Sequence, residues 1–270
     1  MKYDIYKGVI DTRNDVWSLN KDTPGTNGVF LKMRKNVLNT QLYYKLGSYD
    51  SVKGFYGIEC AMEIIAQRIA AWEDIPYVEQ RLAETLVHYN GEDYRTYCIC
   101  SREYRLPGER RVPLEQYCLW NEFGNNHTEA ILQSVFADNI LKVMKLDYII
   151  YNRDRHGANV EVLYNPADKS YQLAPLFDNG CSLVAPSVLR WEELDESYYM
   201  SDAPVNNFLG SMFVLANLRN YCKGRIRMKN EELPADIMKG LDVVLGKDLC
   251  EFVYGMLKAR YENAVDILNS

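Results

Sequence analysis

Two polar stretches, NRDRHGAN at residues 152–159 and FDNG at residues 177–180, decide the fold and the function that this sequence predicts. Each of them follows a segment that is apolar and β-prone, DYIIY at 147–151 and YQLA at 171–174. Polar residues directly after buried strands typically lie at the mouth of a cleft. We therefore expect the side chains of both stretches to face a single site.

A hairpin is predicted between the two polar stretches. The segments 160–164 and 171–174 are strand-like and are separated by an Asn-Pro turn signal. Metal-assisted phosphoryl transfer requires one carboxylate that orients the attacking hydroxyl and accepts its proton, and a second that holds Mg²⁺ against the phosphates of ATP. Asp154 before the hairpin and Asp178 after it have this arrangement.

Asn159 completes the predicted metal site. Mg²⁺ binds few protein oxygens and keeps several water ligands, so the Asp178 carboxylate and one amide oxygen suffice. Asn159 lies five residues after Asp154, a spacing at which a tight loop turns both side chains toward one site. Taken singly, these pieces are also typical of surface turns, because Asp-Asn-Gly is a turn signal. Their combination indicates a phosphoryl-transfer centre that uses Asp154, Asn159 and Asp178 with Mg²⁺ and ATP.

The pattern D-R-H-x-x-N followed by F-D-N-G resembles the catalytic and metal-binding loops of HipA-like serine/threonine kinases, above all their short, CtkA-like form. The resemblance extends over about residues 20–200. It implies an α+β, bilobal, protein-kinase-like fold, with a small β-rich N-lobe at 1–101 and a mainly helical C-lobe at 102–270. The implied activity is phosphorylation of Ser or Thr in a protein, including autophosphorylation.

The resemblance also gives roles to the N-terminal half. Lys45, at the end of an aromatic strand, corresponds to the catalytic lysine that contacts phosphate, and Glu63 to the helix glutamate that pairs with it. Ile99 falls in the segment whose backbone meets adenine. A turn-rich loop before the first strand resembles the phosphate-covering loop, whose backbone N–H groups can cradle phosphate oxygens. The loop residues implied in ATP binding are Gly25, Thr26, Asn27 and Gly28.

Several positions keep two interpretations at this point. Glu59, four residues before the predicted glutamate and on nearly the same helix face, is a rival partner for the lysine. His156 is assigned to the ATP site, where the resemblance implies that it orients the loop by hydrogen bonds. Arg155 either approaches phosphate or forms a salt bridge within its lobe. Thr23 and Thr26 are the candidate sites of autophosphorylation.

Local patterns predict the remaining elements. Strands are expected at 29–34, 41–46 and 97–100. Helices are expected at 58–71, from Thr128 to Val143, and around 230–245 and 247–268. On the second of these helices we place Val135 on the buried face and Thr128 at the N-cap. Residues 101–113 form a candidate hinge between the lobes, and 181–207 has no period and is predicted to be a long loop.

Composition narrows the classes of partner and compartment. A net charge of −6 does not favour a nucleic-acid partner. The chain starts MKYDIYKG without an apolar leader, and no apolar stretch reaches the ~18–20 residues of a membrane span, so we expect neither secretion nor a membrane. Seven scattered cysteines without a CxxC pair favour the reducing cytoplasm over a zinc site.

Other functions stay open. A small-molecule or lipid kinase would use the same loops, although the chain lacks the polybasic or amphipathic anchor that would favour a membrane lipid. A nucleotide-binding pseudokinase or regulatory module would need a defect such as a misplaced Lys45. A metal-dependent hydrolase using Asp154 and Asp178 would leave Lys45 and Glu63 without a role. The sequence names neither the acceptor nor any inhibitory partner protein.

Overall fold

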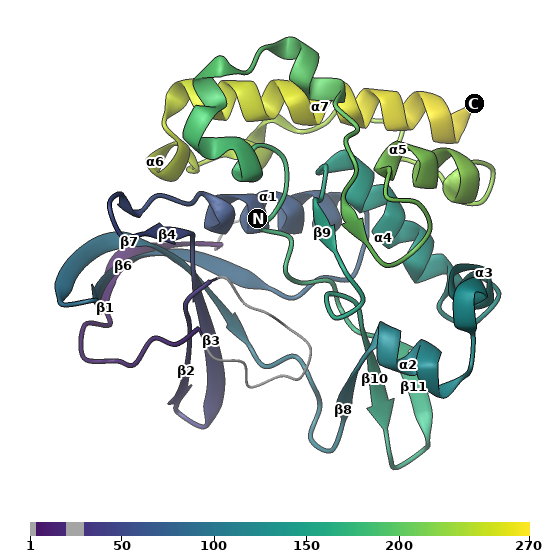
Figure 1. The fold of residues 1–270 in the computed structure, drawn as a ribbon, viewed down its shortest axis with the longest axis horizontal. Coiled ribbons are helices and arrows are strands. Elements are labelled where there is room, and N and C mark those ends of the chain that lie inside the picture. The colour runs from purple at the N-terminus through teal and green to yellow at the C-terminus, as the bar shows by residue number, and fades with distance from the viewer. Residues whose placement is uncertain (1–3, 20–29) are drawn as a thin grey trace.

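The N-terminal part of the chain is a mixed sheet of five strands in the order β1-β6-β7-β3-β2 (Figure 1). The computed structural model describes residues 4–19 and 30–270. β1 runs parallel to β6, and the other neighbours are antiparallel. The strands of this sheet are β1 (Ile5–Asp11), β2 (Lys32–Val37), β3 (Thr40–Leu46), β6 (Gln80–Tyr89) and β7 (Glu92–Arg102).

The β2–β3 hairpin confirms the strand expected at 41–46. Its connection is only two residues long, because Leu38 and Asn39 both have positive φ angles, 49° and 63°, as a tight hairpin turn requires. The expected strand at 97–100 lies inside the longer β7. The strand expected at 29–34 begins at Lys32 in the structure, and Val29 lies outside the described residues.

Helix α1 (Glu59–Trp72) confirms the helix expected at 58–71 and lies between the sheet and the helical part of the chain (Figure 1). The sequence shows an apolar stripe, but every residue from 59 to 70 is buried. A helix covered on all sides must find partners for its charged residues. The Arg68 guanidinium, for example, binds Asp4 at 2.6 Å and the carbonyl oxygens of Ile237 and Lys239.

Two apolar clusters lie on opposite faces of the five-stranded sheet. Leu82 and Ile99 pair across β6 and β7 and join the large core around α1. The next pair, Ala83 and Cys98, points to the other face and joins a smaller cluster around Trp17. Successive strand residues alternate between faces, so the central strands are buried on both.

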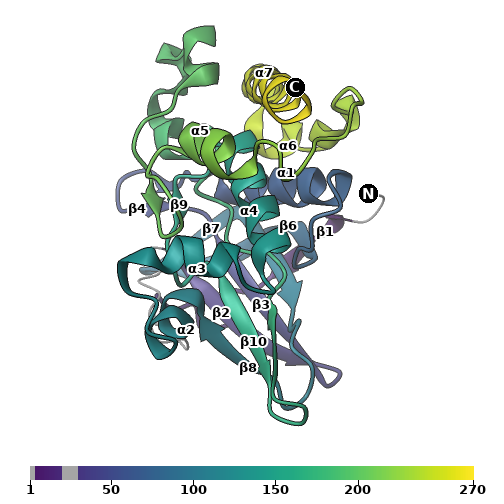
Figure 2. The same ribbon diagram turned by 90° about the vertical axis from the view of Figure 1, so that its right-hand side faces the viewer.

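The C-terminal part combines a three-stranded sheet with helices (Figure 2). Its sheet has the order β11-β10-β8, and the expected hairpin is β10–β11. The strands are β8 (Arg110–Pro113), β10 (Glu161–Asn165) and β11 (Ser170–Leu173). The α-helices are α2 (Leu114–Trp120), α3 (His127–Leu132), α4 (Ala137–Ile149), α5 (Val214–Asn217), α6 (Asp242–Leu245) and α7 (Lys247–Asn269).

Short elements complete the chain. Two-residue strands pair as β4 (Tyr49–Asp50) with β5 (Gly54–Phe55), and as β9 (Asp154–Arg155) with β12 (Asn206–Asn207). The 3₁₀ and π turns are η1 (Gly124–Asn126), η2 (Ala185–Glu193), η3 (Glu196–Met200), η4 (Leu218–Cys222) and η5 (Ala235–Met238). The loop expected at 181–207 thus contains 3₁₀ turns and ends in β12. Among the described residues, no helix is long and apolar enough to cross a membrane.

The strand-like segment predicted at 147–151 is wrong, because it is the end of α4 and its cap. A short apolar run has the same pattern in a buried helix as in a buried strand. The N–H of Asn152 donates to the carbonyl of Asp147 at 2.9 Å, and Tyr151 has φ 45°. This is a Schellman-type helix end. The first polar stretch, 152–159, therefore follows a helix C-terminus and not a strand.

Two of the predicted helices also need correction. The helix expected from Thr128 is broken at residues 133–136 into α3 and α4, and Val135, placed on the buried face, is 85% exposed. The Thr128 hydroxyl accepts from the N–H of Gly210 and does not cap a helix. The region 230–245 holds only the short η5 and α6, because Pro234 interrupts a helical backbone there. The helix expected at 247–268 is confirmed as α7.

The fold class is nevertheless as expected, α+β with a β-rich N-terminal region and a mainly helical C-terminal region. The strands β1 and β6 were not predicted. β1 is an edge strand with exposed residues and Gly8, which weakens its strand pattern. The division of the chain into lobes at 101/102 stays a prediction.

Arg68 provides a test of how α1 is held. Arg68→Met should lower the free energy of unfolding by about 3–5 kcal/mol, because it leaves the Asp4 carboxylate and two carbonyl groups without their buried partner. The control is Arg95→Met, which removes an exposed guanidinium paired with Glu84. That variant should unfold at nearly the wild-type urea concentration. Equal urea midpoints for the two variants would contradict the role given to Arg68.

Candidate active site

Asp154 lies on the loop that follows α4, with its carboxylate at the surface of a cavity. It belongs to β9, which is parallel to β12. Its Oδ1 accepts a hydrogen bond from Asn206 Nδ2 at 2.7 Å, and its Oδ2 is 3.8 Å from His156 Nε2. The Nδ1 of His156 accepts from the N–H of Ala158 at 3.2 Å. His156 therefore makes a hydrogen bond that orients the loop.

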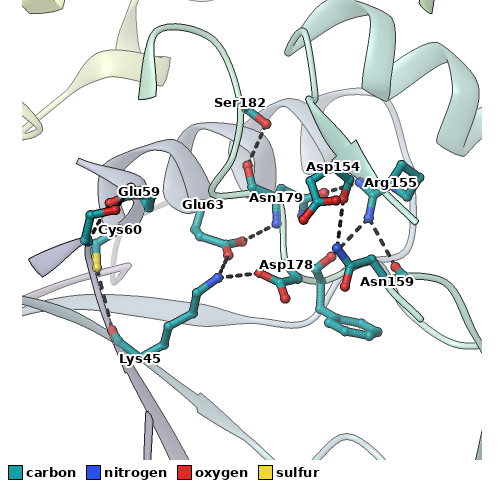
Figure 3. A network of polar contacts seen from close by, with 12 residues as sticks. Lys45, Glu59, Cys60, Glu63, Asp154, Arg155, Asn159, Asp178, Asn179 and Ser182 are labelled. Atoms are coloured by element: carbon teal, nitrogen blue, oxygen red, sulfur yellow. Dashed lines mark hydrogen bonds and ion pairs between the residues drawn. The ribbon is translucent and has the colours of Figure 1, made fainter. Parts of the chain in front are cut away.

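Arg155, by contrast, points into the protein and is 1% exposed (Figure 3). Its guanidinium forms an ion pair with Asp147 of α4 at 2.8 Å. It also donates to the carbonyl oxygens of Asn159 and Phe177, both at 3.2 Å, and to the side chain of Asn179. Burial is the largest single influence and opposes its charge, but the carboxylates of Asp147, Asp178 and Glu63 together raise the pKa of Arg155. Of the two interpretations of Arg155, the structure has the internal salt bridge, which ties the two polar stretches together.

Asn159 presents one satisfied and one unsatisfied polar atom. Its Nδ2 donates to the backbone carbonyl of Asp154 at 2.8 Å. Its Oδ1 is buried and has no hydrogen-bond partner among the residues that the structure describes. An amide oxygen buried without a partner costs about 1–3 kcal/mol, so such an atom needs explanation. A cation bound by this oxygen would remove that cost.

Lys45 connects the sheet to α1 and to the second polar stretch (Figure 3). Its Nζ lies 3.1 Å from Glu63 Oε1 and forms an ion pair with Asp178. The other oxygen of Glu63 accepts from the N–H of Asn179 at 2.9 Å. Burial would lower the pKa of Lys45, but the charges of Asp178 and Glu63 together raise it. Burial would likewise raise the pKa of Asp178, but the Lys45 charge lowers it to about 2.

Glu59 has a different partner, which distinguishes it from Glu63. Its carboxylate accepts from the N–H of Ser48 at 3.0 Å and from the Ser48 hydroxyl.

Gly180 explains how closely the second polar stretch approaches α1. A Cβ there would lie 3.0 Å from Glu59 Cβ and 3.3 Å from Glu63 Oε1. The glycine of FDNG therefore allows this stretch to pack closely against α1.

Two cavities meet at Asp178 and Lys32, which line both. The first, of about 410 Å³, is also lined by Asp154, His156 and Asn159 and is walled by residues 185–190. We call it the acceptor-side cavity. The second, of about 600 Å³, contains the Lys45–Glu63 pair together with apolar side chains, and we call it the lysine-side cavity. The apolar residues of its lining include Met33, Val78, Ile99 and Phe177.

The structure brings most of the predicted site residues to these two cavities. Ile99 contributes a side chain to the lysine-side cavity, but its backbone is paired with β3 and β6 on both sides. The hinge expected at 101–113 starts at the end of β7 and runs into β8. Thr23 and the loop residues Gly25, Thr26, Asn27 and Gly28 lie outside the described residues.

Sequence reasoning missed two partners of the site. Asn206, which binds Asp154, lies 52 residues further along the chain in an aperiodic segment. Asp147, which binds Arg155, was assigned to a strand.

No cluster of three or more His, Cys, Asp or Glu side chains suited to a metal occurs in the described part of the chain. Asp178 and Asn159 still fit Mg²⁺, which takes carboxylate and amide oxygens and completes its shell with water.

Lys45 of the sheet pairs with Glu63 of α1 and also with Asp178 of the C-terminal part. This arrangement defines a protein-kinase-like fold. No family model matches this chain, and no curated protein matches it. Solved structures do match.

One of them is the Helicobacter pylori proinflammatory kinase CtkA, which is 16% identical, with a TM-score of 0.57 and 97% of each chain covered. Another is HipA of Shewanella oneidensis MR-1, solved with HipB and operator DNA. It is 14% identical, with a TM-score of 0.52, and the match covers 93% of this chain and 68% of that one. These likenesses confirm the expected HipA/CtkA-like fold.

The pKa of Asp178 predicts a pH dependence of stability. Folding lowers this pKa from 3.8 to about 2, so the ionised carboxylate contributes stability above about pH 4 and loses it as the pH falls toward 2. Urea titrations should therefore show wild type more stable than Asp178→Asn at about pH 6, with a difference that shrinks below about pH 4. In a Lys45→Met background the shrinkage should be smaller, because the largest of the charges that lower the pKa of Asp178 is gone while Lys32 and Arg155 remain. A constant difference across this range would contradict the ion pair.

Proposed function

We propose that this chain is a Mg²⁺-dependent kinase that transfers the γ-phosphoryl group of ATP to Ser or Thr of a protein, itself included. The observation that carries the proposal is the Lys45–Glu63–Asp178 ion network, which lines the lysine-side cavity and reaches the acceptor-side cavity through Asp178, where Asp154 also lies. One cavity can hold a nucleotide and the other an acceptor. Phosphoryl transfer needs these two sites to meet.

In this proposal the lysine-side cavity binds ATP. Its apolar residues, Ile99 and Val78 among them, suit a purine ring. Lys45 neutralises phosphate charge, and Glu63 fixes the direction of its ammonium group. The raised pKa of Lys45 supports this role, because the amine stays charged throughout the physiological pH range.

Asp178 and Asn159 would hold Mg²⁺. When bound, the ion would neutralise charge on the phosphate oxygens. Two features of the residues support this assignment. The pKa of Asp178, at about 2, keeps its carboxylate ionised. The Oδ1 of Asn159 has no hydrogen-bond partner among the described residues, so its lone pairs can bind a metal ion. From inside the protein, Arg155 binds the carbonyl of Asn159 and the two neighbours of Asp178, Phe177 and Asn179.

Asp154 positions the acceptor hydroxyl and accepts its proton as the phosphoryl group transfers. Its carboxylate lines the acceptor-side cavity and is 37% exposed, so a hydroxyl can reach it. Most of the rate enhancement then comes from positioning and from fixed charges.

Exposed apolar side chains beside this cavity support a polypeptide acceptor. Leu189, 57% exposed, lines the cavity together with Pro186 and Val188. Apolar side chains grouped around a site favour a protein partner over a small polar metabolite. A small-molecule acceptor is the alternative that the experiment below distinguishes.

Three further parts complete the proposal. The lobes would meet at 101/102, near the end of β7. The chain would act in the cytoplasm, where its seven free thiols would stay reduced. Autophosphorylation would fall on Thr23 or Thr26, and an inhibitory partner protein stays a prediction.

The test uses γ-labelled ATP with Mg²⁺ and follows label on protein and as free phosphate. Asp154→Ala should retain ATP binding and lower turnover by about 10²–10⁴-fold. Asp178→Ala should lose Mg·ATP binding. The matched control is Asp168→Ala, in the exposed β10–β11 turn, which should transfer label like wild type.

The outcomes separate the candidate functions. Label on Ser or Thr that is lost in Asp154→Ala supports a protein kinase. Label released only as free phosphate would favour a hydrolase. ATP binding without any transfer would favour a pseudokinase or an absent small-molecule acceptor. Normal turnover in both the Asp154 and the Asp178 variants would overturn the assignment of the site.

A further inference from the structure

The two-residue strand β12 lies directly against the catalytic loop. Its register places Asn206 opposite Asp154. The N–H of Asn206 donates to the carbonyl of Arg153 at 3.1 Å, and the N–H of Phe208 donates to the carbonyl of Arg155 at 3.0 Å. The backbone on both sides of Asp154 is therefore bonded to the same short strand.

The two side chains of β12 have different partners. Asn206 Nδ2 donates to Asp154 Oδ1 at 2.7 Å. Asn207 makes its bonds within its own turn, to the carbonyl of Ser211 at 3.1 Å and from the N–H of Leu209 at 3.2 Å. Within the described ranges, 4–19 and 30–270, Asn206 makes the one direct hydrogen bond to the Asp154 carboxylate.

The segment after β12 is anchored to helices of the C-terminal part. His127 Nε2 pairs with the carbonyl of Phe208 at 2.8 Å, and the two rings stack with centroids 4.5 Å apart. The N–H of Gly210 donates to the Thr128 hydroxyl at 2.9 Å. Two residues of strand pairing are too few to be stable alone, so these contacts hold β12 in place. The place of Asn206 is thus set by α3 as well as by the backbone bonds to the loop that carries Asp154.

An aspartate carboxylate turns easily about its last torsion, which has broad energy wells. The Asp154 carboxylate is also partly exposed, and nothing else in the described structure fixes its rotation. His156 Nε2, at 3.8 Å from Oδ2, is beyond hydrogen-bond distance. The amide of Asn206 is a neutral donor, so it can orient the carboxylate without placing a positive charge beside it.

We propose that Asn206 is a positioning residue for phosphoryl transfer: it holds Oδ1 of Asp154 so that Oδ2 faces the acceptor hydroxyl in the acceptor-side cavity. The inference rests on the proposed function. It assigns to the Asn206 side chain a part in the reaction that is separate from ATP binding. A change at Asn206 should accordingly alter kcat and leave the affinity for nucleotide nearly unchanged.

The experiment compares Asn206→Leu and Asn207→Leu, neighbours on the same strand, in wild type and in Asp154→Ala. Asn206→Leu should lower kcat by about 10–100-fold and change the KM for ATP by less than about 3-fold. Asn207→Leu should stay near wild type. In the Asp154→Ala background, Asn206→Leu should cause no further loss, because it acts through that carboxylate.

A second variant guards against misfolding of the first. Asn206→Asp keeps the shape of the side chain, removes the N–H donor and places a second carboxylate beside Asp154, so it should lose at least as much kcat as Asn206→Leu. Three results would each overturn the inference in favour of a purely structural role. They are equal losses of kcat at Asn206 and Asn207, a loss that persists without the Asp154 carboxylate, and unfolding of both Asn206 variants. Absence of transfer by wild type would overturn the proposed function and the inference with it, whereas active wild type with unchanged Asn206→Leu would overturn the inference alone.

Discussion

The ion network of Lys45, Glu63 and Asp178 is the constraint on which the rest of the structure depends. Its three charged groups come from β3, from α1 and from the loop after β11. Any one of them buried alone would cost several kcal/mol, on the order of the whole stability of a domain. Each is tolerated because the other two are present. The sheet, the helix and the loop must therefore meet within hydrogen-bond distance.

A second network, centred on Arg155, shares one residue with the first. Asn179 donates its N–H to Glu63 and accepts from Arg155 with its side-chain oxygen. The position of α1 is thereby coupled to the loop that carries Asp154 and to the C-terminal end of α4 through Asp147. Because the two networks share Asn179, a shift of either one is transmitted to the other. The small glycine that follows, Gly180, lets this junction lie against α1.

The parts of the site that the sequence predicts are those whose residues are close together in the chain. Asp154, Asn159 and Asp178 flank one hairpin, so their spacing carries information. Glu59 and Glu63 could not be separated, because residues four apart share a helix face and only the tertiary contact with Ser48 or Lys45 decides between them. Asn206 could not be predicted, since its segment has no period and its partner lies 52 residues away. The segment 147–151 was mistaken for a strand because local apolarity does not distinguish a buried helix end from a strand.

The two cavities differ in how regular the structure around them is. The lysine-side cavity is built from paired strands and from α1, whose positions are fixed by backbone ladders and by the ion network. The acceptor-side cavity is walled by η2, an irregular segment whose side chains, such as Leu189, face solvent. Regular structure tolerates few changes, whereas a surface loop tolerates many. Under the proposed function, a chain built in this way would retain its nucleotide chemistry while the wall of the acceptor-side cavity varies. The identity of the acceptor would then depend on the part of the structure that the fold constrains least.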